Sequence, residues 1–205
     1  MTSRAATLAD VAVPVRSEAG LAQWTRAAIL VAAGAGLTAL SAQLYWLAPW
    51  TTIPYTGQTA AVLLVGTVLG SQLGLASMAL YVLLGALGVN VFSGGSSGLF
   101  DSSGALSGSV GYLAGFIVAA WLVGRLAERR WDRSPLRAGG LMVIGNLVIY
   151  AIGVPVLALT AGLSAGDALF YGAIVFVPWD GFKVLVAAGL LPLAWRLVRP
   201  GREER

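Results

Sequence analysis

The stretch GGLMVIGNLVIYAIGVPVLALT, residues 139–160, contains no charged side chain and is rich in Leu, Val and Ile. A helix of about 20 such residues is long enough to cross the hydrocarbon core of a bilayer. Further apolar runs recur along the chain, at about 24–47, 58–73, 75–89, 106–126 and 179–198. The pattern predicts an all-α membrane protein built as a bundle of six transmembrane helices.

The composition excludes a soluble domain and most catalytic classes. Apolar residues make up 58% of the 205 residues and charged residues only 11%, whereas about 25% of the residues in soluble domains are charged. Cysteine and histidine are both absent, which removes thiolate nucleophiles, imidazole bases and the usual ligands of zinc and haem. We therefore expect a protein that is not an enzyme and holds no metal or cofactor.

The basic residues are distributed unevenly over the predicted loops. Because cytoplasmic loops collect Lys and Arg, their distribution predicts that both termini face the cytoplasm, in a protein of the plasma membrane. The opposite loops, at about 48–57, 90–105 and 161–178, contain no basic residue. The membrane topology accounts for the positive net charge, so we do not expect the protein to bind nucleic acid. Twelve of the thirteen basic residues flank spans one, four and six, namely Arg4, Arg16, Arg26, Arg125, Arg129, Arg130, Arg133, Arg137, Arg196, Arg199, Arg202 and Arg205.

Segments between and before the spans complete this organisation. The first 20 residues lack the apolar core of a signal peptide, so we expect a loose cytoplasmic tail over residues 1–23, the helical domain over 24–198 and a second tail over 199–205. Gly70-Ser71-Gln72 predicts a tight turn between spans two and three. Residues 167–177 predict a short or re-entrant helix that Pro178 separates from the last span.

Small residues recur every four positions in three of the spans. Such spacing lets helix backbones approach closely in a membrane. The pattern has two interpretations, which are packing inside the bundle or a docking face for another membrane subunit. It is found in Gly66-Gly70-Gly74 and in Gly111 and Gly115, and Ala28, Ala32, Ala35 and Ala39 give span one a similar stripe of small residues.

Lys183 is the one basic residue that topology does not place at a cytoplasmic loop, and Asp180 lies three residues before it on the same helical face. A charged residue inside the bilayer is expensive, by roughly 2.5–3.5 kcal/mol on insertion scales, and usually faces a cavity or a partner. The pair is either an ion pair that reaches the membrane surface or part of a site for a polar ligand. The ligand site is the interpretation that we favour.

Polar and aromatic residues near the uncharged loops suit a small polar ring in an apolar pocket. A tyrosine at the end of a span is as often an interface anchor as a pocket wall. Ser93–Gly98, SGGSSG, predicts a flexible loop; its GSSG resembles the motif of serine intramembrane proteases, but the chain has no histidine base. The polar and aromatic residues that we consider as candidates for this pocket are Thr56, Gln58, Thr59, Tyr81, Asn90, Phe92, Tyr112 and Tyr150.

Six short motifs occur in the order found in one transporter family. They are Ile53-Pro54-Tyr55-Thr56-Gly57-Gln58-Thr59, the run from Gly74 through Ser77, Leu80-Tyr81 and Gly85 to Gly88, Val91-Phe92-Ser93-Gly94-Gly95, Gly111-Tyr112-Leu113-Ala114-Gly115-Phe116, Ile149-Tyr150 with Gly153-Val154-Pro155, and Pro178 with Asp180 and Lys183. In this order the chain resembles BioY over about residues 27–195. BioY is the biotin-specific substrate-binding subunit (S component) of energy-coupling-factor (ECF) transporters.

The resemblance implies a six-helix subunit that captures biotin outside the cell. It also implies a transmembrane coupling subunit and cytoplasmic ATPases as partners, with Ala35 and Ala39 in the docking face of the first helix. Together with the candidates named above, the ligand contacts that we expect are Asp180, Lys183, Asn90, Thr56, Gln58, Tyr81, Phe92, Tyr112 and Tyr150.

The chain departs from the family pattern where a carboxylate of biotin would bind. No arginine occurs between residues 27 and 124, which leaves Lys183, Asn90 or backbone amides as candidates for that contact. Other readings remain: an autonomous proton-coupled transporter of biotin or a related vitamin, in which Asp180 carries the proton, and an S component for a different vitamin. The chain has no Walker A motif, so ATP-driven uptake requires partner subunits.

Overall fold

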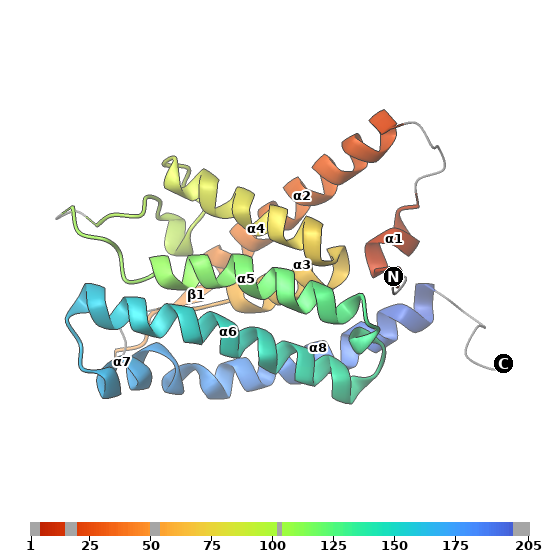
Figure 1. Ribbon diagram of the computed structural model, residues 1–205. Coiled ribbons are helices and arrows are strands. Elements are labelled where there is room, and N and C mark those ends of the chain that lie inside the picture. Colours follow the sequence, from red (N-terminus) through yellow and green to blue (C-terminus); the bar gives the residue numbers. More distant parts are fainter. Residues whose placement is uncertain (1–4, 15–19, 50–53, 102–103, 199–205) are drawn as a thin grey trace.

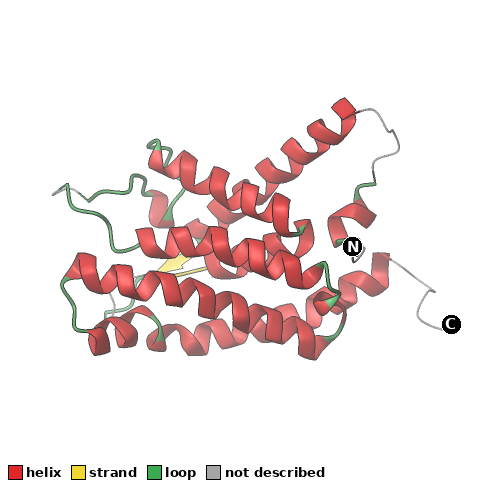
Figure 2. Cartoon of the chain, in the orientation of Figure 1, coloured by secondary structure: helices red, strands yellow, loops and turns green. Residues whose placement is uncertain are grey.

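The computed structural model describes residues 5–14, 20–49, 54–101 and 104–198. Within these ranges, four helical segments are long and apolar enough to cross a membrane. Two shorter apolar helices, α3 and α4, follow the first of them. Helices account for almost all of the regular structure (Figure 2). The α-helices are α1 (Leu8–Ala12), α2 (Gly20–Gln43), α3 (Gln58–Leu69), α4 (Ser71–Ala86), α5 (Val110–Ala127), α6 (Pro135–Ala161), α7 (Ala165–Gly172) and α8 (Val177–Val198).

Short elements occupy the connections between the helices. Strands β1 (Tyr45–Trp46) and β2 (Tyr55–Thr56) pair in antiparallel fashion, with Tyr45 opposite Thr56. Single turns of 3-10 helix lie at η1 (Ser93–Gly95), η2 (Trp131–Arg133) and η3 (Ile174–Phe176).

The helices pack as one bundle with two unlike ends (Figure 1). At one end lie helix α1, the turn between α5 and α6, and the end of α8. We call it the arginine end because all seven described arginines lie there, from Arg26 at the start of α2 to Arg196 in the last turn of α8. The α6–α7 turn and the long α4–α5 connection lie at the opposite end, which we call the cavity end. The charge distribution read from the sequence is thus a property of the fold.

The six predicted apolar runs each correspond to a helix, in the predicted order. Their ends differ by a few residues: α6 begins at Pro135 rather than 139, and α5 begins at Val110 rather than 106. Helices α3 and α4 have 12 and 16 residues, so at 1.5 Å per residue they extend about 18 and 24 Å. Both are shorter than the hydrocarbon core, and six full spans therefore stay a prediction.

The predicted hairpin between α3 and α4 turns on a single residue, Gly70, whose φ of 82° is in the region that favours glycine. Glu128, at the end of α5, holds this turn. Its Oε1 accepts hydrogen bonds from the backbone N–H and the hydroxyl of Ser71, both at 2.8 Å. A carboxylate at this position also interacts favourably with the N-terminus of α4.

The break before the last helix lies earlier than Pro178. The chain leaves the helical conformation at Ala173, with φ −140° and ψ −57°, and Pro178 belongs to the first turn of α8. Proline fits there because the first N–H groups of a helix have no intrahelical acceptor.

Glycines pack the interior of the bundle, as one of the two interpretations of the small-residue pattern predicts. A Cβ added to Gly66 would lie 2.5 Å from the backbone oxygen of Ala120, and one added to Gly74 would lie 2.8 Å from the Cα of Gly66. A Cβ added to Gly115 would likewise lie 3.0 Å from the Cα of Ile149 on α6. These contacts join α3, α4, α5 and α6 at distances that larger side chains do not permit.

The N-terminal segment contains a docked helix where the sequence predicts a loose tail. Helix α1 begins with a capping box between Thr7 and Asp10 and buries Leu8 against the bundle core. Arg26 on α2 donates from Nε to the carbonyl of Val13 at 2.7 Å and forms an ion pair with Asp10 at 3.3 Å. The segment therefore links the start of α2 to the arginine end of the bundle.

Asp132 fastens the end of α8 to the α5–α6 turn. Its carboxylate is fully buried and accepts a hydrogen bond from Trp195 Nε1 at 2.5 Å. Burial raises the pKa of the Asp132 carboxyl above its ordinary value, while the hydrogen bond from Trp195 opposes that shift. The guanidinium of Arg133 lies 4.2 Å from the centre of the Trp195 ring and supplies a nearby positive charge.

The close approach at Gly66 predicts that a change to alanine destabilises the protein at this position but not at Gly36. Gly66→Ala should lower the thermal unfolding temperature in detergent, because overpacking against the Ala120 backbone costs about 1–3 kcal/mol. Gly36→Ala is the control, since a Cβ there meets no atom within 4 Å and alanine is favoured in helices by about 1 kcal/mol. An unfolding temperature for Gly66→Ala equal to or above that of Gly36→Ala would contradict this packing.

Candidate functional site

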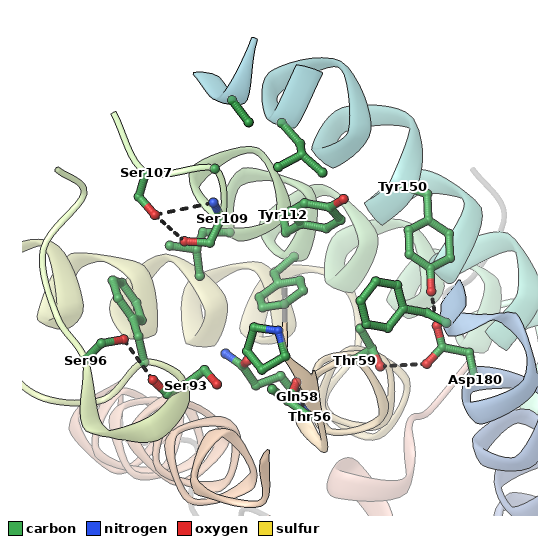
Figure 3. Close-up of a pocket in the computed structure, with 18 of the residues that line it drawn as sticks. Thr56, Gln58, Thr59, Ser93, Ser96, Ser107, Ser109, Tyr112, Tyr150 and Asp180 are labelled. Carbon is green, nitrogen blue, oxygen red and sulfur yellow. Dashed lines mark hydrogen bonds between the residues drawn. The ribbon is translucent and has the colours of Figure 1, made fainter. Parts of the chain in front are cut away.

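A cavity of about 510 Å³ opens at the cavity end of the bundle between α3, α5, α6 and α8 (Figure 3). Its size and mixed lining suit a small molecule with both apolar and polar groups. The lining residues are Pro54, Thr56, Gln58, Thr59, Phe92, Ser93, Ser96, Ser107, Gly108, Ser109, Tyr112, Leu113, Phe116, Tyr150, Leu157, Ala161, Phe176, Asp180 and Lys183.

One end of the cavity is formed by a charged cluster of four side chains from three helices. Lys183 Nζ lies 2.8 Å from Asp180 Oδ1 and donates to Thr59 Oγ1 at 2.7 Å. Thr59 in turn donates to Asp180 Oδ1 at 3.2 Å, and the hydroxyl of Tyr150 donates to Asp180 Oδ2. The cluster thus ties α3, α6 and α8 together at the cavity.

The charged pair is enclosed by protein. The side chains of Lys183 and Asp180 are 11% and 8% exposed. Asp180 lies in the first turn of α8, where a carboxylate is favoured by the helix dipole, and Lys183 follows one turn later on the same face. This burial favours the ligand site over the ion pair at the surface. A buried pair of this kind stays favourable only while its hydrogen bonds are satisfied.

Aromatic rings form the walls between the two ends of the cavity. Tyr112 on α5 lines the cavity and donates to the carbonyl of Gly172 at 2.8 Å. Tyr55, with its ring 4.7 Å from that of Phe176, donates to the carbonyl of Val175 at 2.8 Å. Two tyrosine hydroxyls therefore fix the α7–α8 connection, and Phe176 is held against the cavity.

Gln58 is positioned by a residue behind the cavity wall. Its Nε2 donates to the hydroxyl of Tyr81 at 2.6 Å. Tyr81 is fully buried and stacks edge-on with Phe92 at 5.4 Å between ring centres. Tyr81 thus orients Gln58 and Phe92, which both line the cavity.

Of the described residues that line the opposite end of the cavity, four are serines and none is charged. Ser93 and Ser96 come from the turn that contains η1, and Ser107 and Ser109 precede α5. The hydroxyls of Ser107 and Ser109 lie 3.0 Å apart, and Ser96 donates to the carbonyl of Ser93 at 2.8 Å. Figure 3 shows these serines across the cavity from Asp180. We call this group the serine end and the cluster around Asp180 the charged end.

The cavity brings together most of the residues that the sequence singles out. Seven of the nine predicted ligand contacts line it, which are Thr56, Gln58, Phe92, Tyr112, Tyr150, Asp180 and Lys183. Tyr81 lies behind Gln58, as described above. Asn90 is exposed and lies outside the lining. Their roles as ligand contacts remain predictions.

The two alanines predicted to dock a partner do not lie on an open surface. Ala35 is 3% exposed within the core, and Ala39 is partly buried against it. Ala28 and Ala32 of the same stripe, together with Gly36, are exposed on α2.

Several lining residues were not predicted from the sequence. The loop serines Ser96, Ser107 and Ser109 carry no periodic signal, because their positions depend on how the α4–α5 connection folds. Phe116 and Leu157 read as ordinary residues of apolar helices. The run of Ser107, Gly108 and Ser109 at the start of the apolar stretch predicted over 106–126 was the one available cue.

The site has the chemistry of recognition rather than catalysis. It offers one carboxylate acceptor beside one ammonium donor, with hydroxyl groups around them and aromatic walls. Within the described ranges, no group of three or more His, Cys, Asp or Glu side chains is placed to hold a metal ion. Such an arrangement binds a small neutral polar group through charge-assisted hydrogen bonds.

Comparisons with known proteins agree with this description. The model of the BioY family matches residues 7–200. The biotin transporter BioY of Rhizobium etli is 36% identical over 146 residues, which cover 66% of this chain and 74% of that protein. The biotin transporter BioY of Thermotoga maritima is 37% identical over 155 residues, which cover 74% of this chain and 86% of the relative.

A solved structure shares the fold. The S component for biotin from an ECF-type ABC transporter superposes with a TM-score of 0.73 and 18% sequence identity, over 85% of this chain and 93% of that one. At this identity the match shows the fold alone, and the family model and the curated relatives show the family. The chain belongs to the BioY family and is a membrane transport protein rather than an enzyme.

Proposed function

We propose that this protein captures biotin outside the cell and takes it up across the plasma membrane as the substrate-specific subunit of an ECF transporter. The observation that carries the proposal is the buried pair of Asp180 and Lys183, which lines a cavity of suitable size in a chain of the BioY family. The names of the relatives and of the structural neighbour supply the ligand and the type of transporter.

The chemistry of biotin complements the charged end of the cavity. Its ureido group presents N–H donors beside a carbonyl acceptor, while Asp180 offers an acceptor beside the Lys183 donor. Its thiophane ring and aliphatic chain are apolar and suit walls such as Tyr112, Phe116 and Phe176. The proposal needs no resident cofactor.

The proposed topology has six spans, with α3 and α4 as the two short ones and both termini in the cytoplasm. The arginine end then faces the cytoplasm, in agreement with the rule for basic residues, and the cavity opens outward. The proposed partners are a transmembrane coupling subunit and cytoplasmic ATPases. For Ala35 and Ala39 to contact the coupling subunit, α2 must tilt away from the bundle, because Ala35 is buried in this structure.

Autonomous proton-coupled transport is the second candidate, because Asp180 is a buried carboxylate inside the membrane domain. We expect uptake of labelled biotin by cells that express this chain to require the coupling subunit and ATPases, because the chain has no ATP-binding motif of its own. The control measures uptake after the proton gradient is collapsed while ATP is maintained. Uptake that survives loss of the ATPases and stops with the proton gradient would favour the autonomous transporter instead.

Substitution of the charged pair should weaken biotin binding to the purified protein. Hydrogen bonds to charged groups contribute about 1.5–3 kcal/mol, so Asp180→Asn and Lys183→Met should each raise the Kd by about tenfold to a hundredfold. Binding of labelled biotin measures this effect. Asp167→Asn is the matched control, because this acidic residue is exposed and lies outside the cavity. Wild-type protein that stays folded and does not bind biotin would refute the proposed ligand.

The same pair predicts a non-additive effect on stability without ligand. Lys183→Met leaves the Asp180 carboxylate buried without its cation, which costs roughly 3–5 kcal/mol. The double variant Asp180→Asn with Lys183→Met should recover part of this loss, because no unbalanced charge remains. Thermal unfolding in detergent measures both variants. A double variant less stable than either single one would show that the charges are not coupled in this way.

A further inference from the structure

The two ends of the cavity differ in charge and in exposure. The charged end is enclosed, since Asp180 and Lys183 are about nine-tenths buried. At the serine end Ser96 and Ser109 are exposed, and Ser93 and Ser107 are partly buried. A long ligand therefore has one end held inside the protein and the other end near the opening.

No described residue supplies a cation at the serine end. The sequence contains no Lys or Arg between residues 27 and 124, nor between 138 and 182. Among the described residues, Lys183 is the one basic residue near the cavity, and its ammonium lies 2.8 Å from Asp180 Oδ1. Figure 3 shows Asp180 across the cavity from the serines. A carboxylate at the serine end would meet hydroxyl groups and solvent.

The charged end disfavours a carboxylate from the ligand. Asp180 Oδ1 already accepts from Lys183 and Thr59, and Oδ2 accepts from Tyr150. A second carboxylate beside it would place two negative charges around one ammonium in an enclosed setting, which is unfavourable. A ureido group carries no charge and matches the donor and acceptor together.

Given the proposed function, in which the ureido group faces the charged end, we propose that this protein also binds biotin derivatives in which the carboxyl group is esterified or linked through an amide, because the serine end offers that group hydroxyls and no cation from the described residues. Hydroxyl groups can donate to an ester or amide carbonyl in place of a carboxylate, and because a hydrogen bond to the charged acceptor is stronger, the derivatives lose part of the binding and not all of it. The unpartnered hydroxyl of Ser93, whose oxygen is buried, is one donor for that carbonyl. A substituent on the carboxyl group leaves the cavity past Ser96 and Ser109 without entering the bundle.

Competition against labelled biotin on the purified full-length protein tests this assignment. Biotin methyl ester and biotinyl-lysine should bind within about tenfold of biotin, because neither loses a charged partner. 2-Iminobiotin should bind at least about a hundredfold more weakly, because it replaces the carbonyl acceptor that faces Lys183 with a donor. If biotin binds and the ester and the amide are both weaker by a hundredfold or more, the carboxylate charge is recognised and the assignment is wrong. Failure of biotin itself to bind would instead overturn the proposed function.

A cation introduced at the serine end gives an independent measurement. Ser109→Arg should raise the ratio of the methyl ester Kd to the biotin Kd by about tenfold, because the acid alone gains a charged partner. Ser97→Arg is the control, since Ser97 lies in the same connection and outside the lining. An unchanged ratio in Ser109→Arg, or an equal rise in Ser97→Arg, would contradict the location of the carboxyl group.

Discussion

The buried ion pair of Asp180 and Lys183 constrains the rest of the membrane domain. Two charges inside a bilayer are tolerated because each has a partner, and those partners come from three different helices through Thr59, Tyr150 and the pair itself. The helices must therefore meet at one point near the cavity end. Glycine contacts nearer the arginine end, such as Gly66 on Ala120, make that convergence possible by letting the backbones approach.

Much of the fold was predictable because its signals are local. Uncharged apolar runs located the helices, and the short segment Gly70-Ser71-Gln72 between two such runs located the hairpin, in which Gly70 adopts a positive φ. The helix limits were less accurate, because an apolar run does not show where a cap such as Ser134 begins a helix. Helix α1 was missed since its five residues carry little periodicity, and its position depends on Arg26, thirteen or more residues away.

The site was predictable where chemistry and spacing coincide. Asp180 and Lys183 stand out because charge is rare in such a chain, and a spacing of three places them on one helical face. The serine end was not predictable, since Ser96 and Ser109 line the same cavity only after the α4–α5 connection has folded. Ala35 shows the opposite case: the small-residue pattern was correctly seen, but its spacing did not reveal that Ala35 faces the core.

The short α3–α4 hairpin sets a condition on the surrounding lipid. At about 18 and 24 Å, these helices fall short of a hydrocarbon core of about 30 Å, while α2, α6 and α8, with 24, 27 and 22 residues, do not. A bilayer around this protein must thin locally beside the hairpin or let headgroups sink toward Gly70. The protein is thus matched to a membrane that is thinner on one flank than on the other, and a thick, stiff bilayer would oppose this fold.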